Sequence, residues 1–235
     1  MTPARRLLVS IAGAAAFSFS AAQAEPVRHV GIYVQPYYEA ARDPGGTPRV
    51  AVGRSFEGLA SNKREDILAI RDRIVADPKL VTPMTLMVLA IRFYDVGLRD
   101  DAVFWFYAAK DRFLTLDGVV DVGAGGLAQV EDAIRNFSTL AGPIINGYAF
   151  CDIANQQAIR AKALDWVEQN PYEAIFMERL PAKQSNRKQA LVEAVAMLRA
   201  NAAKESAYLQ DAGNAAKYRA ERARNGTDEK YCWKS

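Results

Sequence analysis

The sequence is poor in the residues that most often carry metal-ion and nucleophilic chemistry. Its 235 residues include one histidine, His29, and two cysteines, Cys151 and Cys232. One imidazole and two thiols do not complete an ordinary structural zinc site, and a Ser-His-Asp catalyst would have to use His29. No serine lies in a Gly-x-Ser-x-Gly context. We therefore predict no metal site and no cofactor, and an enzyme is the less favoured reading.

An excess of charge of one sign is also absent. The 30 Lys and Arg residues against 27 Asp and Glu give a net charge of +3, and Arg5 and Arg6 account for two of these charges. The chain after residue 24 is therefore nearly neutral, and it has no basic stripe of the kind that marks nucleic-acid binders. It also lacks a run of about 18 apolar residues. We predict no nucleic-acid partner and no transmembrane segment in this part.

The first 24 residues have the pattern of a secretion signal. Arg5 and Arg6 precede the apolar stretch Leu7–Phe19, and Ala22-Gln23-Ala24 gives the small-x-small sequence that signal peptidase reads. The stretch is shorter than the roughly 20 residues that span a bilayer. We predict a cleaved signal peptide at 1–24 and a periplasmic or secreted protein of the Gram-negative type. An uncleaved anchor is the alternative, and the export route stays open.

Export would place the two cysteines in an oxidising compartment, where disulfides persist. An even number of cysteines favours a bond between Cys151 and Cys232, with two free or buried thiols as the alternative. By the loop-closure model such a bond would stabilise the fold by about 4 kcal/mol. It would tie the C-terminal tail to the middle of the chain.

Residues 25–60 differ in composition from the rest. The segments 27–34 and 49–52 are rich in β-branched residues and flank the turn cluster Asp43–Pro48, which predicts a short β-hairpin or an extended arm. Tyr33, Tyr37 and Tyr38 lie in this arm. They are candidate binding residues that would cover the helical body.

Residues 61–235 are predicted to form a helical domain, because apolar residues recur there at helical spacing. We expect a mainly α fold, a bundle of roughly seven helices. The expected helices cover 61–77, 83–94, 100–113, 127–141, 148–169, 172–180 and the region after Ser185, and Gly142-Pro143 is expected to end the fourth of them. The segment 84–94 is apolar on nearly every face, so a central, buried αα-hairpin is predicted.

This hairpin, residues 83–114, resembles a tetratricopeptide or Sel1-like repeat. Leu86, Leu89, Ala90 and Phe93 take the marked positions of the first helix, Gly97 that of the turn glycine, and Ala102, Phe106 and Ala109 those of the second helix. Leu114 replaces the usual closing proline. The resemblance implies a scaffold for protein–protein contact, and an ordinary αα-hairpin in a helical bundle is the alternative.

The segment 119–126 resembles the glycine-rich loop of S-adenosylmethionine-dependent methyltransferases. That chemistry requires the loop to lie between a strand and a helix in a parallel βαβ unit. The segment before the loop is expected to be helical, and no alternation of strands and helices follows. We interpret 119–126 as a loop between helices.

The carboxylate side chains are the best candidates for catalytic residues in the chain. Asp95, Asp100, Asp101 and Asp111 lie around the central hairpin among Arg92, Arg99, Lys110 and Arg112. A glycosidase needs two carboxylates that face one cleft, and Asp100 and Asp101 are the candidates. Both also lie at an expected helix start, where acidic residues stabilise the helix.

Three functions follow from these patterns. The first is an exported, non-enzymatic protein that binds another protein, such as an immunity or scaffold protein. The second is a cell-wall-directed hydrolase of the glycosidase type that uses Asp100 and Asp101. The third is a binder of small apolar ligands beside Trp105. The oligomeric state is left open.

Overall fold

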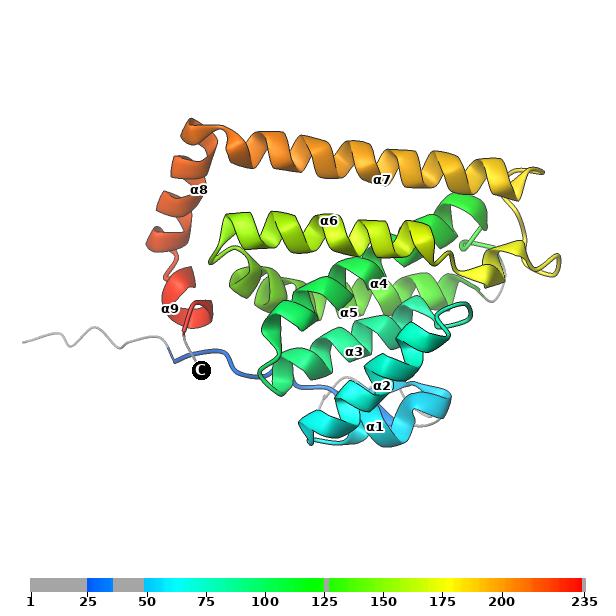
Figure 1. Cartoon of the computed structure of the whole chain (residues 1–235), viewed down its shortest axis with the longest axis horizontal. Helices are drawn as coiled ribbons and strands as arrows, with labels where there is room; N and C mark the ends of the chain where they lie inside the picture. The colour runs from blue at the N-terminus through cyan, green and yellow to red at the C-terminus, as the bar shows by residue number, and fades with distance from the viewer. Residues whose placement is uncertain (1–24, 36–48, 125–126, 234–235) are drawn as a thin grey trace, which may run out of the picture.

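The computed structural model describes residues 25–35, 49–124 and 127–233 (Figure 1). The predicted signal peptide at 1–24, and Tyr37 and Tyr38 of the predicted arm, lie outside these residues. The described chain is mainly helical, which confirms the predicted fold class. Its α-helices are α1 (Phe56–Ala60), α2 (Arg64–Ala76), α3 (Pro83–Asp95), α4 (Arg99–Val119), α5 (Ala128–Ala149), α6 (Ile153–Gln169), α7 (Arg187–Gln210), α8 (Ala212–Arg224) and α9 (Thr227–Tyr231).

The hairpin of α3 and α4 forms the centre of the molecule. Thr82 accepts a hydrogen bond from the backbone N–H of Thr85 at 3.1 Å, and Pro83 occupies the first turn, where its missing N–H costs nothing. Nearly every residue from Leu86 to Tyr94 is fully buried. Helix α4 contacts α3, α5, α6 and α7, so it is the common neighbour of the bundle.

The two short strands do not form the predicted hairpin. Strand β1 (Tyr33–Gln35) pairs in parallel with β2 (Arg49–Ala51), with Val34 opposite Val50. A hairpin requires antiparallel strands, and parallel strands need a longer connection that returns to the same end. The hairpin prediction is therefore wrong, and the alternative of an extended arm fits residues 25–35. The arm ends against α1, a helix that the sequence pattern did not predict.

Proline 143 does not end a helix, contrary to our prediction. Helix α5 continues through Pro143 to Ala149, so the next helix begins at Ile153 and not at 148. An interior proline removes one backbone hydrogen bond. Packing compensates for this loss, because Ala141, Gly142 and Ile145 around the proline are buried against the central helices.

Other helix ends also differ from the predicted ones. Helix α4 extends to Val119, six residues beyond the predicted end at 113. Within 172–180, where a helix was expected, the structure has only the short 3-10 helix η3 (Glu173–Phe176). The predicted final helix is divided at Asp211, whose carboxylate accepts a hydrogen bond from the N–H of Asn214 and caps α8.

One buried cation connects three parts of the chain. Arg112 of α4 is fully buried, and its guanidinium donates to the carbonyl oxygens of Pro78 at 2.8 Å, Val81 at 2.9 Å and Asn170 at 2.6 Å. It also lies over the ring of Trp166, 4.7 Å from the ring centre. Burial lowers the pKa of Arg112 to about 10. The end of α2, the start of α3 and the end of α6 therefore meet at one side chain.

We predict that Arg112→Met lowers the free energy of unfolding by about 3 kcal/mol or more, because three buried carbonyl groups lose their donor. Urea unfolding followed by circular dichroism measures the change. Arg135→Met is the matched control, since Arg135 forms an exposed i,i+4 ion pair with Glu131, and it should cost about 0.5 kcal/mol or less. Equal losses in the two variants would contradict the central role of Arg112.

Candidate functional site

A cavity of about 220 Å³ lies between α6 and α7. Gln156 and Arg160 are four residues apart on α6, so they lie on the same face of that helix. Its polar lining consists of Gln156, Gln157, Arg160, Arg199, Glu205 and Ser206, and Leu164 with three alanines supplies the apolar lining. Helix α4 packs against both helices (Figure 1), and its residues Tyr107 and Asp111 contact the lining residues Gln156 and Arg160.

A chain of hydrogen bonds joins α5, α4, α6 and α7 beside the cavity. The hydroxyl of Tyr107 donates to Asn146 Oδ1 at 3.2 Å and accepts from Gln156 Nε2 at 2.9 Å. The same amide nitrogen donates to Glu205 Oε1 at 2.9 Å. Burial raises the pKa of Tyr107 to about 12, because the charged phenolate is disfavoured away from water.

A buried ion pair lies next to this chain. Both terminal guanidinium nitrogens of Arg160, Nη1 and Nη2, donate to the carboxylate of Asp111, with Nη2 and Oδ1 3.1 Å apart. Asp111 is 3% exposed, and burial raises the pKa of its carboxyl group. Burial also lowers the pKa of the neighbouring Lys110. The interior between α4, α6 and α7 therefore holds charged groups that most helical cores exclude.

Two polar atoms of α6 lack a partner in this region. Within the described part of the chain, neither Gln156 Oε1 nor Gln157 Nε2 makes a hydrogen bond, and Gln156 is 1% exposed. An unsatisfied buried polar atom costs free energy, and in native proteins it often marks the place of a water molecule or ligand. The arrangement is suited to binding a small polar molecule.

The sequence pointed to only part of this site. Asp111 and Lys110 were among the charged residues noted around the hairpin, but Gln156, Arg160 and Glu205 were missed. The sequence does contain a signal for Gln156 and Arg160, because these polar residues interrupt the inward face of α6 next to the buried Ile159 and Ala163. Glu205 leaves none, since it becomes part of the site only when α7 packs beside α6.

The two predicted catalytic carboxylates face different neighbours. Asp100 accepts hydrogen bonds from Tyr148 Oη at 2.9 Å and Asn155 Nδ2 at 3.1 Å. Asp101 is influenced by Arg71 and Arg64 of α2, and partial burial raises its pKa. Both lie in the first turn of α4, whose N-cap is Leu98. The two carboxylates therefore have different hydrogen-bond and ion-pair neighbours, although the charge of Asp100 helps to raise the pKa of Asp101.

The predicted binding residues are also dispersed. Tyr33 is 52% exposed, and the guanidinium of Arg49 lies 5.2 Å from its ring centre. Trp105 is buried, with its ring centre 5.0 Å from that of Phe104 and 5.1 Å from that of Trp166. The structure therefore brings Tyr33 and Trp105 to different parts of the molecule and gives Trp105 a role in core packing.

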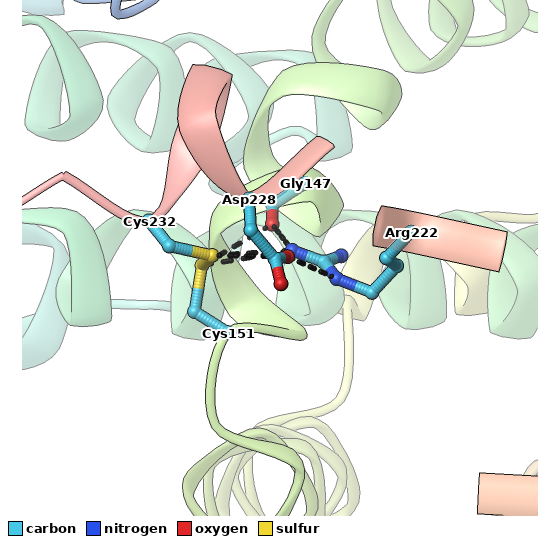
Figure 2. Close-up of polar contacts among 5 residues, drawn as sticks. All are labelled: Gly147, Cys151, Arg222, Asp228 and Cys232. Atoms are coloured by element: carbon cyan, nitrogen blue, oxygen red, sulfur yellow. Dashed lines mark hydrogen bonds and ion pairs between the residues drawn. A yellow bond between two sulfur atoms is a disulfide. The ribbon is translucent and has the colours of Figure 1, made fainter. Parts of the chain in front are cut away.

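Cys151 and Cys232 are joined by a disulfide, as the sequence predicted (Figure 2). Arg222 of α8 lies beside this bond. Its Nε donates to Asp228 Oδ1 at 2.7 Å, and its Nη2 donates to the carbonyl of Gly147 at 2.9 Å. The tail from α8 to residue 232 is therefore fixed to the end of α5 by one covalent bond and by a buried arginine.

The two ends of the described chain meet at this place. The backbone N–H of Val27 donates to the carbonyl of Lys230 at 3.0 Å. The guanidinium of Arg28 lies 4.4 Å from the ring centre of Trp233, and that of Arg99 lies 3.4 Å from it. Arg99 also donates to the carbonyl of Trp233 at 2.9 Å. We call residues 222–233 together with the arm residues 27 and 28 the terminal clamp.

Residues 25–35, 49–124 and 127–233 contain neither a metal-binding cluster nor a membrane-spanning helix. No group of three or more His, Cys, Asp or Glu side chains in these ranges is placed to hold a metal ion. No helix in them is both long and apolar enough to cross a membrane. The loop at 120–124 follows the end of α4 at Val119, so a helix and not a strand precedes it.

Comparison with known proteins finds a relative in Haemophilus influenzae. The two chains are 34% identical over 210 residues, which cover 89% of this chain and 81% of the relative, and the relative is described only as an uncharacterized protein. No protein-family model matches the chain. No solved structure matches it either.

We predict that stability falls as the pH rises from about 10 to about 12, in part because of Tyr107. An unfolded tyrosine loses its proton near pH 10, whereas the folded protein retains the proton on Tyr107 up to about pH 12. Native Tyr107 thus binds more protons in this range, and its contribution is fully present below pH 10. Its loss amounts to about 1.4 kcal/mol per pH unit at most.

Urea unfolding at several pH values between 10 and 12 measures this effect. Tyr107→Phe should make the decline in the free energy of unfolding shallower. Tyr208→Phe is the control, because Tyr208 is 52% exposed, and it should leave the decline as in the parent protein. A Tyr107→Phe slope identical to that of the parent would refute the assignment.

We also predict that Asp100→Asn and Asp101→Asn each lower the free energy of unfolding by about 0.5–1 kcal/mol, because the first turn of α4 loses a negative charge. Thermal and urea unfolding measure this loss. Asp132→Asn, an exposed position beyond the first turn of α5, should have almost no effect. Release of sugars from purified peptidoglycan by the parent protein, lost in both Asn variants at unchanged stability, would favour the hydrolase instead.

Proposed function

The chain belongs to the family of this Haemophilus influenzae protein, and we propose that it is an exported protein that binds another protein in the periplasm. Two features of the chain support export. The leader at 1–24 has the charge, apolar length and small-x-small ending of a signal peptide. The second feature is the disulfide of the terminal clamp.

The disulfide between Cys151 and Cys232 is the observation on which the proposal chiefly depends. It joins residues 81 positions apart, and one of its cysteines, Cys151, is exposed. An exposed bond of this kind persists in an oxidising compartment and is reduced in the cytosol of most bacteria. The position of the disulfide supports the same interpretation. It fixes the C-terminal tail beside the extended arm, and this arm directly follows the predicted leader.

Features of the surface and of the core support the proposed binding to a protein. The central α3–α4 hairpin has the residue pattern of a tetratricopeptide-like scaffold. The outermost long helix, α7, exposes three large apolar side chains: Val192, Met197 and Tyr208 are each more than half exposed. An immunity protein that neutralises a toxin delivered to the periplasm is one concrete form of this proposal.

The proposal is tested in two steps with protein expressed from its full-length gene. Mass spectrometry of the periplasmic fraction should find a chain that begins at Glu25 and resists thiol alkylation unless it is first reduced. Cross-linking in the periplasm should then capture a partner, and Met197→Glu with Tyr208→Glu should reduce its yield several-fold, whereas Glu193→Lys should have a smaller effect.

Two results would contradict the proposal. Intact protein that keeps Met1 and has two free thiols in the cytosolic fraction would rule out export. A correctly processed periplasmic protein that stays alone under all cross-linking conditions would retain export and remove the protein partner.

A further inference from the structure

We propose that the disulfide between Cys151 and Cys232 is a redox-sensitive switch for the terminal clamp. Its reduction by a dithiol releases residues 212–233, which we call the tail, and with them the arm residues 27 and 28, while the central helices stay folded. This switch goes beyond the proposed function, because it requires neither export nor a protein partner. Three features carry the inference: the small buried surface of the tail, the dependence of the arm on the tail, and the exposure of the disulfide.

The tail buries little apolar surface of its own. Of residues 212–233, only Ala215 and Arg222 are buried. Helix α8 leaves the end of α7 at the edge of the molecule (Figure 1). A segment with few buried apolar contacts opens at a lower cost in free energy than the core of the same protein. The covalent bond at Cys232 therefore supplies a large part of what holds the tail in place.

The non-covalent contacts around the disulfide are mostly polar. Arg222 Nη2 donates to the carbonyl of Gly147 at 2.9 Å and lies 3.3 Å from Cys232 Sγ, and Arg222 Nε binds Asp228 (Figure 2). The ring of Tyr231 packs on the backbone of Gly147, where an added Cβ would lie 2.5 Å from the ring. These contacts lie within the tail or join it to the end of α5. Reduction weakens those that join the two segments, because the freed tail gains conformational entropy when it opens.

The start of the arm depends on the tail. The backbone N–H of Val27 donates to the carbonyl of Lys230 at 3.0 Å, and the guanidinium of Arg28 lies 4.4 Å from the ring centre of Trp233. Both tail residues are within two positions of the disulfide. A further contact, from the hydroxyl of Tyr94 to the carbonyl of Val27 at 2.9 Å, does not involve the tail. Release of the tail therefore removes a hydrogen bond and a cation–π contact from the start of the arm.

The disulfide is within reach of a dissolved dithiol, because Cys151 is exposed. One thiolate of the dithiol attacks the sulfur of Cys151 and forms a mixed disulfide, while the bond between Cys151 and Cys232 breaks and Cys232 leaves as a thiolate that takes a proton from water. The second thiol of the reductant loses its proton and attacks its partner sulfur in the mixed disulfide, which releases Cys151. The protein gains two thiols, and the dithiol is oxidised to its own disulfide.

The experiment records amide signals of the ¹⁵N-labelled protein, expressed from its full-length gene and purified in the oxidised form, before and after addition of dithiothreitol. The reporters are the amides of Val27 and Cys232, which donate to the carbonyls of Lys230 and Asp228. On reduction both should move to random-coil chemical shifts and exchange with solvent about tenfold faster or more. The amide of Val120, which is fully buried in the core, should keep its native chemical shift.

A double variant separates the loss of the bond from other effects of the reductant. Cys151→Ser with Cys232→Ser should show the released tail and arm without dithiothreitol. Addition of dithiothreitol to this variant is the matched control and should leave its spectrum unchanged. If the double variant does not fold, reduction of the parent protein remains a complete test, because the parent folds with its disulfide in place before the reductant is added.

Three results would overturn the proposal. Native signals of Cys232 in the reduced protein would mean that the non-covalent contacts hold the tail without the bond. A native Val27 signal beside a released Cys232 would remove the dependence of the arm on the tail. Loss of the native Val120 signal would make the disulfide a requirement for the whole fold and not a local switch. None of these results bears on where the protein works or whether it has a protein partner.

Discussion

The fold depends on a single buried guanidinium. Arg112 is fully buried, and it donates to the carbonyls of Pro78 and Val81 in the loop between α2 and α3 and to the carbonyl of Asn170 after α6. A buried charge is costly unless it is paired or hydrogen-bonded. Here backbone carbonyls near the ends of helices α2 and α6 accept the hydrogen bonds, and helix C-termini also carry partial negative charge. The positions of α2 and α6 relative to α4 are thus specified together.

The side chains of helix α4 differ in polarity from one face of the helix to another. Some of its side chains are apolar and buried in the core, such as Ala102 and Phe106, the second of which lies beside Gly142 of α5. Toward α6 and α7 it presents Tyr107 and Asp111, which are buried among polar partners. The second face is energetically more expensive than an apolar contact of the same size. The cavity between α6 and α7 adjoins this second face. The terminal clamp lies at the ends of the chain and acts independently, through the disulfide and Arg222.

Local chemistry was sufficient to predict several elements of this fold. Thr82-Pro83 marks the start of α3 because a side-chain cap and a proline need only their own neighbours to form. The apolar segment after it predicted a buried helix, since a helix without a polar face has to be enclosed. The pairing of Cys151 with Cys232 followed from their number and the leader, and the mainly helical class followed from periodicity. None of these inferences required knowledge of distant contacts.

Tertiary structure decided the features that sequence patterns predicted wrongly or for which they gave no signal. Pro143 remains inside α5 because the burial of its neighbours outweighs the lost hydrogen bond. The direction of pairing of β1 and β2 depends on the path of the chain between them, which β propensity does not encode. The candidate site combines Asp111, Gln156 and Glu205 from three helices. Sequence alone determined that the chain is mainly helical and which cysteines are available to pair. Only the packing of the helices brought the polar side chains together, since hydrogen bonds and ion pairs act over a few ångströms in space and not along the chain.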